Sequence, residues 1–391
     1  MKINSYLQQN QHIKILERLV KINSSNPGGN EMDMVKAILS LYPLDEVEYT
    51  VIDHEQNRGS LVIQIEGKNP NKAVAFVGHI DTVPVEDENL WKHPPFDAII
   101  EGDLMYGRGT SDMKGGVTAM ILTSLYYIEN RIKPPVNLLF CFTADEESDG
   151  IGITAIRKKG FLDSVDEIFI AEPTEEKIGI VEKGSLWLSL KAGGRAAHGS
   201  RPDLGVNAIE LMYDFIGRLR DRIDTKTTNP LVGNTTLSIT QIKGGIKSNI
   251  IPSNASATLD IRTIPGANHE EIIRFAEQIA QKLMADHAGL SIKVNVDNNR
   301  PPVGIDHKHE FIERLKAIYR ELNLDDRSKG LYFYTDASQI IPFMNKPFVI
   351  LGPGEDSMAH QRDEKISLAS VKKVASIYLH YLMKNQYEET L

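Results

Sequence analysis

The chain has 391 residues, with 44 Lys and Arg against 53 Asp and Glu, which gives a formal net charge of −9. Hydrophobic residues make up 41% and charged residues 25%, the balance of a globular protein with enough chain for two domains. The acidic balance argues against a nucleic-acid-binding protein. The single cysteine, Cys141, excludes an intrachain disulfide and a cysteine-rich zinc site, and in the apolar run VNLLFCFT we expect it to be a small core residue.

The apolar segments also bear on the cellular location. The N-terminus, MKINSYLQQNQHIKI, is polar and lacks the apolar core of a secretory signal. No apolar stretch approaches the roughly 20 residues that cross a bilayer. We therefore expect a cytoplasmic protein with no membrane partner.

The outer parts of the chain predict an α/β sheet. Apolar residues at helical spacing predict a helix over about 13–20 and another over about 32–42. Beyond them, short apolar runs alternate with helical patterns, as in a mostly parallel sheet that helices cover on both faces. The predicted strands are LVIQI (61–65), AVAFVG (73–78), VNLLFCFT (136–143), EIFIA (167–171) and FVIL (348–351).

The middle of the chain has a different pattern. Its strands alternate apolar and polar residues, as a sheet with one open face does, and two amphipathic helices lie among them. These segments are SLWLSLKA (185–192), 206–222, TTLSITQI (235–242), SATLDIRTI (256–264) and 268–287. They predict an inserted α+β domain with a β-α-β-β-α-β order, of the ferredoxin-like kind, over residues 181–297. Residues 1–180 and 298–391, with a further helix at 308–322, then form the main domain.

Side chains of the kind that bind metals follow four of the predicted strands. They are His79 with Asp81, the run Asp145–Glu147, Glu172 and, further from its strand, His360. Ligands bind at the carboxyl ends of the strands in such sheets, so we expect these side chains to converge. A lone His is more often structural and an acidic pair more often solvated. Two His with several carboxylates and no thiol, however, match zinc, manganese or cobalt.

The glycine-rich segment GRGTSDMKGG (107–116) adds another carboxylate, Asp112, just before a helix expected to begin near Lys114. Its glycines permit close approach of the backbone. The segment alone could suggest phosphate binding, but it lacks the GxxxxGK[ST] pattern. Asp112 is therefore a further candidate metal ligand, and two His with three carboxylates can hold two metal ions if one carboxylate bridges them.

Five segments together resemble one family of zinc deacylases and exopeptidases, which includes acetylornithine deacetylase, succinyl-diaminopimelate desuccinylase, aminoacylases and related carboxypeptidases. The segments are GHIDTVP (78–84), GRGTSDMKGG (107–116), ADEES (144–148), AEPT (171–174) and GPGEDSMAH (352–360). They occur in the family's order, and the resemblance covers essentially the whole chain. YTDAS (334–338) and GPGEDSMAHQRDEKI (352–366) resemble the desuccinylase-like group of Gram-positive bacteria.

The resemblance implies a zinc-exopeptidase-like main domain that holds two divalent metal ions, zinc first, with cobalt or manganese as alternatives. The implied ligands are His79, Asp112 and Glu172 for one ion, and Asp112, Glu147 and His360 for the other. Asp81 would orient the His79 imidazole. Glu146 would be the general base that takes a proton from water and returns it to the departing amine.

The inserted domain would act as a lid and dimerisation domain. The resemblance implies that His198 stabilises the oxyanion, often from the partner subunit of a homodimer. Asn249 and Arg262 would bind the substrate's α-carboxylate, with further substrate contacts from Thr335 and Gly352, and Tyr334 and Asp336 would line the pocket. From the residues alone, His198 reads as a surface histidine and Arg262 as one partner of a strand-edge ion pair.

The implied reaction is hydrolysis of the amide bond of an N-acyl-L-amino acid, above all N-succinyl-L,L-diaminopimelate or N-acetyl-L-ornithine. The acyl group stays open, because Arg201 and Lys183 could either bind an anionic succinyl tail or be solvated charges. A metallo-dipeptidase or aminopeptidase on the same scaffold is the alternative enzyme. A non-catalytic binding protein that keeps the fold is the alternative from another class.

Overall fold

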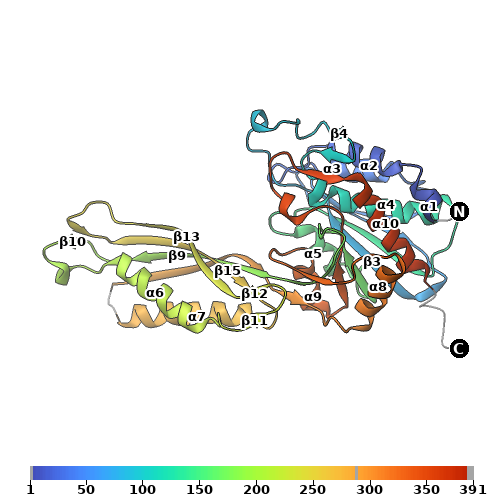
Figure 1. The fold of residues 1–391 in the computed structure, drawn as a ribbon. Coiled ribbons are helices and arrows are strands. Elements are labelled where there is room, and N and C mark those ends of the chain that lie inside the picture. The colour runs from blue at the N-terminus through green and yellow to red at the C-terminus, as the bar shows by residue number, and fades with distance from the viewer. Residues whose placement is uncertain (1–2, 287–288, 385–391) are drawn as a thin grey trace. The chain divides into compact units, whose positions relative to one another are not determined.

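A computed structural model describes residues 3–286 and 289–384. The chain forms two compact units. Unit 1 comprises Met1–Ile180, Ile305–Lys329 and Thr335–Leu391, and unit 2 comprises Val181–Gly304 and Gly330–Tyr334. The insert was expected over 181–297, whereas unit 2 runs on to Gly304 and takes in a second short segment. Each unit has its own sheet and helices (Figure 1).

The large sheet of unit 1 has the order β1-β2-β6-β3-β7-β19-β8. Neighbours among β6, β3, β7 and β19 are parallel, and the outer strands are antiparallel to their neighbours. The strands are β1 (Glu48–Asp53), β2 (Gly59–Ile65), β3 (Asn69–His79), β6 (Val136–Thr143), β7 (Glu167–Ile170), β8 (Ile178–Glu182) and β19 (Phe348–Ile350). The predicted α/β class is confirmed. The predicted strand at 61–65 exists, but it runs antiparallel to β6.

Helices cover this sheet on both faces (Figure 1). They are α1 (Ile3–Leu7), α2 (Gln11–Val20), α3 (Glu31–Leu39), α4 (Gly115–Glu129), α5 (Ile151–Lys158), α8 (Glu310–Glu321), α9 (Ala337–Met344) and α10 (Leu368–Met383). Because α10 and α2 both pack on α4, α4 is buried along almost its whole length. A small antiparallel sheet contains β4 (Ile99–Glu101), β5 (Leu104–Tyr106) and β20 (Lys365–Ser367).

An aromatic cluster fills the core between the sheet and α8 and α10. Phe76 of β3 stacks on Phe140 and Phe169 of the neighbouring strands, with ring centroids 5.1 and 5.0 Å apart. Tyr378 of α10 closes on Phe76 at 4.9 Å. Cys141 of β6 is fully buried, and burial raises the pKa of its thiol to about 12. It is the inert core residue that the sequence predicted.

Unit 2 has an antiparallel sheet in the order β13-β15-β9-β16. Its elements follow the chain as β9 (Gly184–Gly193), α6 (Ala208–Arg222), β13 (Thr236–Gly244), β15 (Asn254–Thr263), α7 (His269–Asp286) and β16 (Ser291–Arg300). This is the predicted β-α-β-β-α-β order. Leu186, Leu188 and Leu190 of β9 face the helices, while Trp187 lies on the open face of the sheet. The helix predicted from 206 begins at Ala208, because Asn207 caps it by accepting a hydrogen bond from the Ile209 N–H.

Short strands complete the description. They are β10 (Ala197–His198), β11 (Thr228–Asn229), β12 (Gly233–Asn234), β14 (Ile250–Ile251), β17 (Val303–Gly304) and β18 (Ser328–Leu331). Within residues 3–286 and 289–384, no helix combines the length and the apolar character that a bilayer span requires.

Candidate metal centre

The candidate ligands of unit 1 lie near the carboxyl ends of its parallel strands. His79 ends β3 in register with Thr143 at the end of β6, and Ile350 of β19 lies in register with Ile170 of β7. Because these strands run in the same direction, the segments that follow them meet at their carboxyl ends. The structure therefore brings together the residues that the sequence placed after four strands.

The first ligand group is His79, Asp112 and Glu172, all buried. His79 Nε2 lies 3.0 Å from Asp112 Oδ1 and 3.6 Å from Glu172 Oε1. Burial alone would lower the pKa of His79, but the carboxylates of Glu172 and Asp112 outweigh it and hold that pKa well above its ordinary value. Burial, reinforced by the Asp112 carboxylate, holds the pKa of Glu172 well above its ordinary value.

The second group is Asp112, Glu147 and His360. His360 Nε2 lies 3.0 Å from Glu147 Oε2 and 3.4 Å from Asp112 Oδ2. Hydrogen bonds to Asp112 and Glu147 raise the pKa of His360 to about 10. Asp112 thus presents one carboxylate oxygen to each group, and within each group the candidate ligand atoms lie within 4.8 Å of one another.

The donor set fits two divalent cations that share Asp112. Glu147 Oε1 is buried and has no hydrogen-bond partner within the described part of the chain. Burial and the nearby Asp112 carboxylate raise the pKa of Glu147. The two groups thus hold three carboxylates against two histidines, and the excess negative charge favours bound cations. Imidazole nitrogens and carboxylate oxygens without thiolates suit zinc, cobalt or manganese.

A buried carboxylate shapes the loop that carries Asp112. Glu364 accepts hydrogen bonds from the backbone N–H groups of Gly109, Ser111 and Asp112 at 2.9, 2.8 and 3.0 Å. Arg108 Nη1 donates to the same carboxylate at 2.9 Å. Sequence analysis did not find Glu364, because an acid in the run QRDEK carries no local sign that it is buried.

Two glycines pack against the turn that carries Glu172. A Cβ on Gly352 would lie 2.2 Å from the carbonyl oxygen of Ala171 and 2.4 Å from that of Glu172. A Cβ on Gly116 would lie 2.0 Å from the Ala171 oxygen. Gly352 was expected to touch substrate, and the structure places it against the backbone of a candidate ligand.

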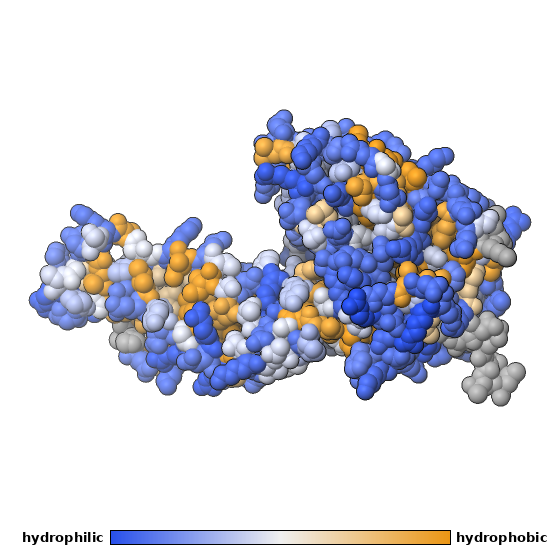
Figure 2. Space-filling view, viewed as in Figure 1, coloured by the Kyte–Doolittle hydropathy of each residue, from blue (hydrophilic) through white to orange (hydrophobic). Residues whose placement is uncertain are grey.

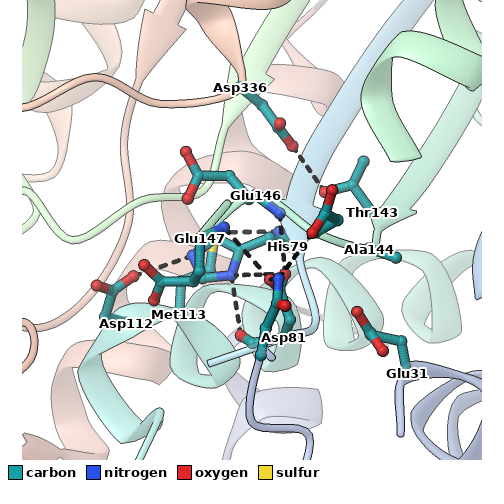
Figure 3. Close-up of polar contacts among 12 residues, drawn as sticks. Glu31, His79, Asp81, Asp112, Met113, Thr143, Ala144, Glu146, Glu147 and Asp336 are labelled. Carbon is teal, nitrogen blue, oxygen red and sulfur yellow. Dashed lines mark hydrogen bonds and ion pairs between the residues drawn. The ribbon is translucent and has the colours of Figure 1, made fainter. Parts of the chain in front are cut away.

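Asp81 reaches both the histidine and the acidic turn (Figure 3). Nδ1 of His79 is 3.0 Å from the carbonyl oxygen of Asp81 and 3.5 Å from its carboxylate. That carboxylate also accepts hydrogen bonds from the backbone N–H groups of Glu146 and Glu147, at 3.2 and 3.3 Å. The expected contact with the imidazole is thus made mainly by the backbone, and the carboxylate holds the acidic turn.

Thr335 and Asp336 lie buried at the start of α9. Thr335 Oγ1 accepts a hydrogen bond from the Ala337 N–H at 3.1 Å. Asp336 Oδ2 accepts one from Thr143 Oγ1 at 2.6 Å, which fastens α9 to the end of β6 (Figure 3). These contacts give both residues a structural role beside the ligand groups.

A known protein family matches most of this chain. The model of peptidase family M20/M25/M40 matches residues 75–384. The chain belongs to this family. A probable succinyl-diaminopimelate desuccinylase of Staphylococcus aureus is 28% identical to it and covers 95% of this chain and 96% of its own. The M20/M25/M40 chain is therefore a metal-dependent amidohydrolase, so the resemblance inferred from the five segments is confirmed and the non-catalytic alternative is set aside.

Solved structures have the same fold as this M20/M25/M40 chain. Aminopeptidase PepT from Bacillus cereus gives a TM-score of 0.77 at 19% identity, covering 96% of this chain and 98% of its own. A dinuclear metal binding peptidase of the M20 family from Bacillus subtilis gives a TM-score of 0.69 at 17% identity, covering 97% and 98%. At these identities the likeness shows the fold, and the substrate has to be argued separately.

Unit 2 of this M20/M25/M40 chain holds the expected lid residues. His198 is exposed on β10, with Nδ1 2.8 Å from Ser200 Oγ. The Gly199 N–H donates to the Asn249 carbonyl at 2.8 Å, so His198 and Asn249 lie side by side. Arg262 lies near the other end of the sheet, where its Nε binds Asp260 Oδ1 at 2.9 Å.

Two further cations of unit 2 have partners of their own. Arg201 forms a two-pronged ion pair with Asp203 on the surface, the closer contact being 2.8 Å. Lys183 is buried and donates to the Asn234 carbonyl at 2.6 Å. Of the two, Arg201 has the features of a solvated charge, which was one of the two alternatives that the sequence left open.

Proposed function

We propose that this M20/M25/M40 enzyme hydrolyses the amide bond of N-acyl-L-amino acids, with N-succinyl-L,L-diaminopimelate as the first substrate to test. The observation that carries the proposal is the pair of ligand groups that share Asp112, beside the buried Glu146. The relative named for desuccinylation, aligned over 95% of this chain, supports the acyl group.

The two metal ions, zinc first and cobalt or manganese as alternatives, would be held by the two ligand groups, and when bound they supply positive charge that activates water and stabilises an anionic transition state. Glu146 takes a proton from the attacking water and delivers it to the amine nitrogen of the leaving amino acid. Its carboxylate extends in a different direction from that of Glu147 (Figure 3), which is consistent with separate roles for the proposed base and the candidate ligand.

Residues of unit 2 complete the reaction in this proposal. His198 donates a hydrogen bond to the oxyanion that forms on the carbonyl carbon. Arg262 and Asn249 bind the α-carboxylate of the substrate, for which the planar guanidinium of Arg262 is suited. These roles are assigned from the family resemblance.

The proposal includes a homodimer through unit 2. The strand β15 separates Arg262 from the end of the sheet that carries His198 and Asn249. Ala255 and Arg262 are seven positions apart, which corresponds to about 24 Å at strand geometry. One copy of unit 2 thus presents these groups far apart, and a second copy supplies His198 and Asn249 to a site that Arg262 of the first copy serves.

The edge of unit 2 offers a surface for this dimer. Within the described residues β13 pairs only with β15, and an unpaired edge strand is a template for pairing with another chain. Ile242 of β13 is 60% exposed and Ile246 beyond it is 88% exposed. Figure 2 shows apolar surface over the part of unit 2 where β13 and α6 lie. Ile242→Asp is expected to give monomers in sedimentation velocity, while Leu90→Asp, at an exposed site of unit 1, stays dimeric.

The substrate test is a parallel turnover assay on zinc-loaded enzyme with a chelator-treated control. The substrates are N-succinyl-L,L-diaminopimelate, N-acetyl-L-ornithine and free dipeptides. Metal-dependent hydrolysis of the succinyl compound is the expected result, and preference for the acetyl compound would change the acyl group. Hydrolysis of dipeptides alone, with a requirement for a free amine, would replace the proposal by a metallo-dipeptidase or aminopeptidase.

A further inference from the structure

A buried row of polar side chains lies behind Asp81 and is not used by the reaction proposed above. Asn26 Nδ2 donates to Asp81 Oδ2 at 3.0 Å and to Asp145 Oδ1 at 2.8 Å. Arg58 Nη2 donates to the same Asp145 oxygen at 2.6 Å and to Glu31 Oε1 at 2.7 Å. The five residues are not neighbours in the sequence, and hydrogen bonds link them into one continuous series.

The row is shielded from water. The side chains of Glu31 and Asp145 are 0% and 1% exposed, and that of Arg58 is 19% exposed. A buried ion pair of this kind is often no more stabilising than apolar side chains of the same volume. Stability alone therefore does not account for such a row, and its end at the metal centre suggests a different role.

Both ends of the acidic turn are held by this row. The Asp81 carboxylate accepts the N–H groups of Glu146 and Glu147. Asp145, at a left-handed φ of 68°, begins the turn, and its carboxylate accepts the Ile151 N–H at 3.3 Å. The turn that carries the proposed base and a candidate ligand thus depends on two carboxylates, and Asn26 and Arg58 fix those carboxylates.

We infer that Asn26 and Arg58 are positioning residues of the metal centre. They act through Asp81 and Asp145, which set where Glu146 and Glu147 lie, and they touch neither substrate nor metal. Hydrogen-bond partners behind metal ligands typically change metal affinity or activity by about 10–100-fold when they are removed. The inference rests on the proposed roles of Glu146 and Glu147.

Unit 1 offers a matched control for Arg58. Arg314 of α8 also binds a buried carboxylate, that of Glu167, and its side chain is 27% exposed. Glu167 begins β7, whereas Glu172 follows the end of that strand. The Arg314–Glu167 pair therefore lies at the amino end of the strand, away from the ligand groups. Arg314→Met removes an ion pair of similar burial without reaching the ligand groups.

The test measures Co²⁺ binding to metal-free full-length protein by titration, together with the melting temperature. We expect Arg58→Met to weaken Co²⁺ binding by about 10–100-fold and Arg58→Lys to weaken it less. Arg314→Met should lower the melting temperature and keep the wild-type affinity. Wild-type Co²⁺ affinity in Arg58→Met, or an equal loss in Arg314→Met, would overturn the inference.

A second variant keeps the test decisive if Arg58→Met does not fold. Asn26→Ala removes a neutral amide at the link between Asp81 and Asp145, and we expect the same weakening of Co²⁺ binding. Wild-type affinity in this variant would also overturn the inference. Because metal binding needs no substrate, the result stands even if the protein turns over none of the acyl-amino acids.

Discussion

The Glu364 carboxylate accepts a hydrogen bond from the backbone N–H of Asp112 at 3.0 Å, so one buried acid sets the position of another. The two residues are 252 positions apart in the sequence. Glu364 neutralises Arg108 at the same time, which ties the loop before α4 to the segment after His360. Both ligand groups share Asp112, and therefore both depend on Glu364.

The first prediction concerns this acid. Glu364→Gln would leave the Arg108 guanidinium buried without its anion and place an amide N–H against backbone donors. We expect the free energy of unfolding to fall by about 3–5 kcal/mol in urea titrations. Glu66→Gln is the control, since Glu66 pairs with Lys133 at the surface with its side chain 76% exposed, and should change stability by less than about 1 kcal/mol. Equal effects of the two substitutions would contradict the role of Glu364.

The second prediction concerns Gly352. In Gly352→Ala the new methyl group would meet two backbone carbonyls, so the turn that carries Glu172 has to shift. We expect stability to fall by roughly 1–3 kcal/mol and Co²⁺ binding to weaken. Gly217 is the matched control, because it lies inside α6 with open space around its Cβ position, and Gly217→Ala should gain about 0.5–1 kcal/mol. Wild-type metal binding in Gly352→Ala would show that the turn tolerates the methyl group.

The third prediction separates the proposed base from the ligands. Glu146→Gln is expected to lower kcat by roughly 10²–10⁴-fold while Co²⁺ affinity stays close to wild type, because the proposed role of Glu146 is proton transfer and not metal binding. Glu147→Gln should instead weaken Co²⁺ binding at the second ligand group. Steady-state kinetics and metal titration on both variants check this. Full turnover by Glu146→Gln would remove Glu146 from the mechanism.

The fourth prediction concerns pH. Burial, helped by nearby Lys372, lowers the pKa of His12 in α2 from 6.5 to about 4. Between those values the unfolded chain binds a proton that the folded protein does not, so stability is lost as pH falls from about 6.5 through about 4. The difference of 2.5 units corresponds to about 3 kcal/mol. Urea titrations at several pH values should show this slope, and His12→Gln should flatten it.

The control for His12 is His307, whose side chain is 61% exposed. His307→Gln should keep the wild-type slope between pH 4 and 6.5. If His12→Gln loses stability as steeply as the wild type on acidification, other groups cause the dependence.

Much of the metal centre could be predicted from sequence because its ligands follow strands. An apolar run that ends in His79 or Glu172 marks both the strand and its carboxyl end, and five motifs in order, one of them the glycine-rich segment 107–116, marked the family. The supporting residues carry no such mark. Arg58 lies in the polar run HEQNRGS, and its burial depends on Glu31 and Asp145, which only the fold brings to it.

The direction of β2 was hidden for a similar reason. Its apolar residues would suit a buried strand of either direction, and β1, which pairs with it, is too polar and exposed to stand out as a strand. In unit 2 the alternating pattern was enough to predict the strands, because every second side chain of a strand points to the open face of the sheet. The positions of His198 and Arg262 at opposite ends of the sheet could not be predicted in the same way, because they depend on the strand register.

The order of the ligands along the chain has a consequence for synthesis on the ribosome. His79, Asp112 and Glu172 all precede unit 2, whereas His360 follows it and lies 213 positions after Glu147. Domains generally fold as units during synthesis, and unit 1 includes segments on both sides of unit 2. The nascent protein therefore has His79, Asp112 and Glu172 early, but neither ligand group is complete until the C-terminal part of unit 1 has been made, because Glu364 positions Asp112 and His360 belongs to the second group. A chain that stops after unit 2 would lack both His360 and Glu364, and with them the second ligand group and the support of the shared Asp112.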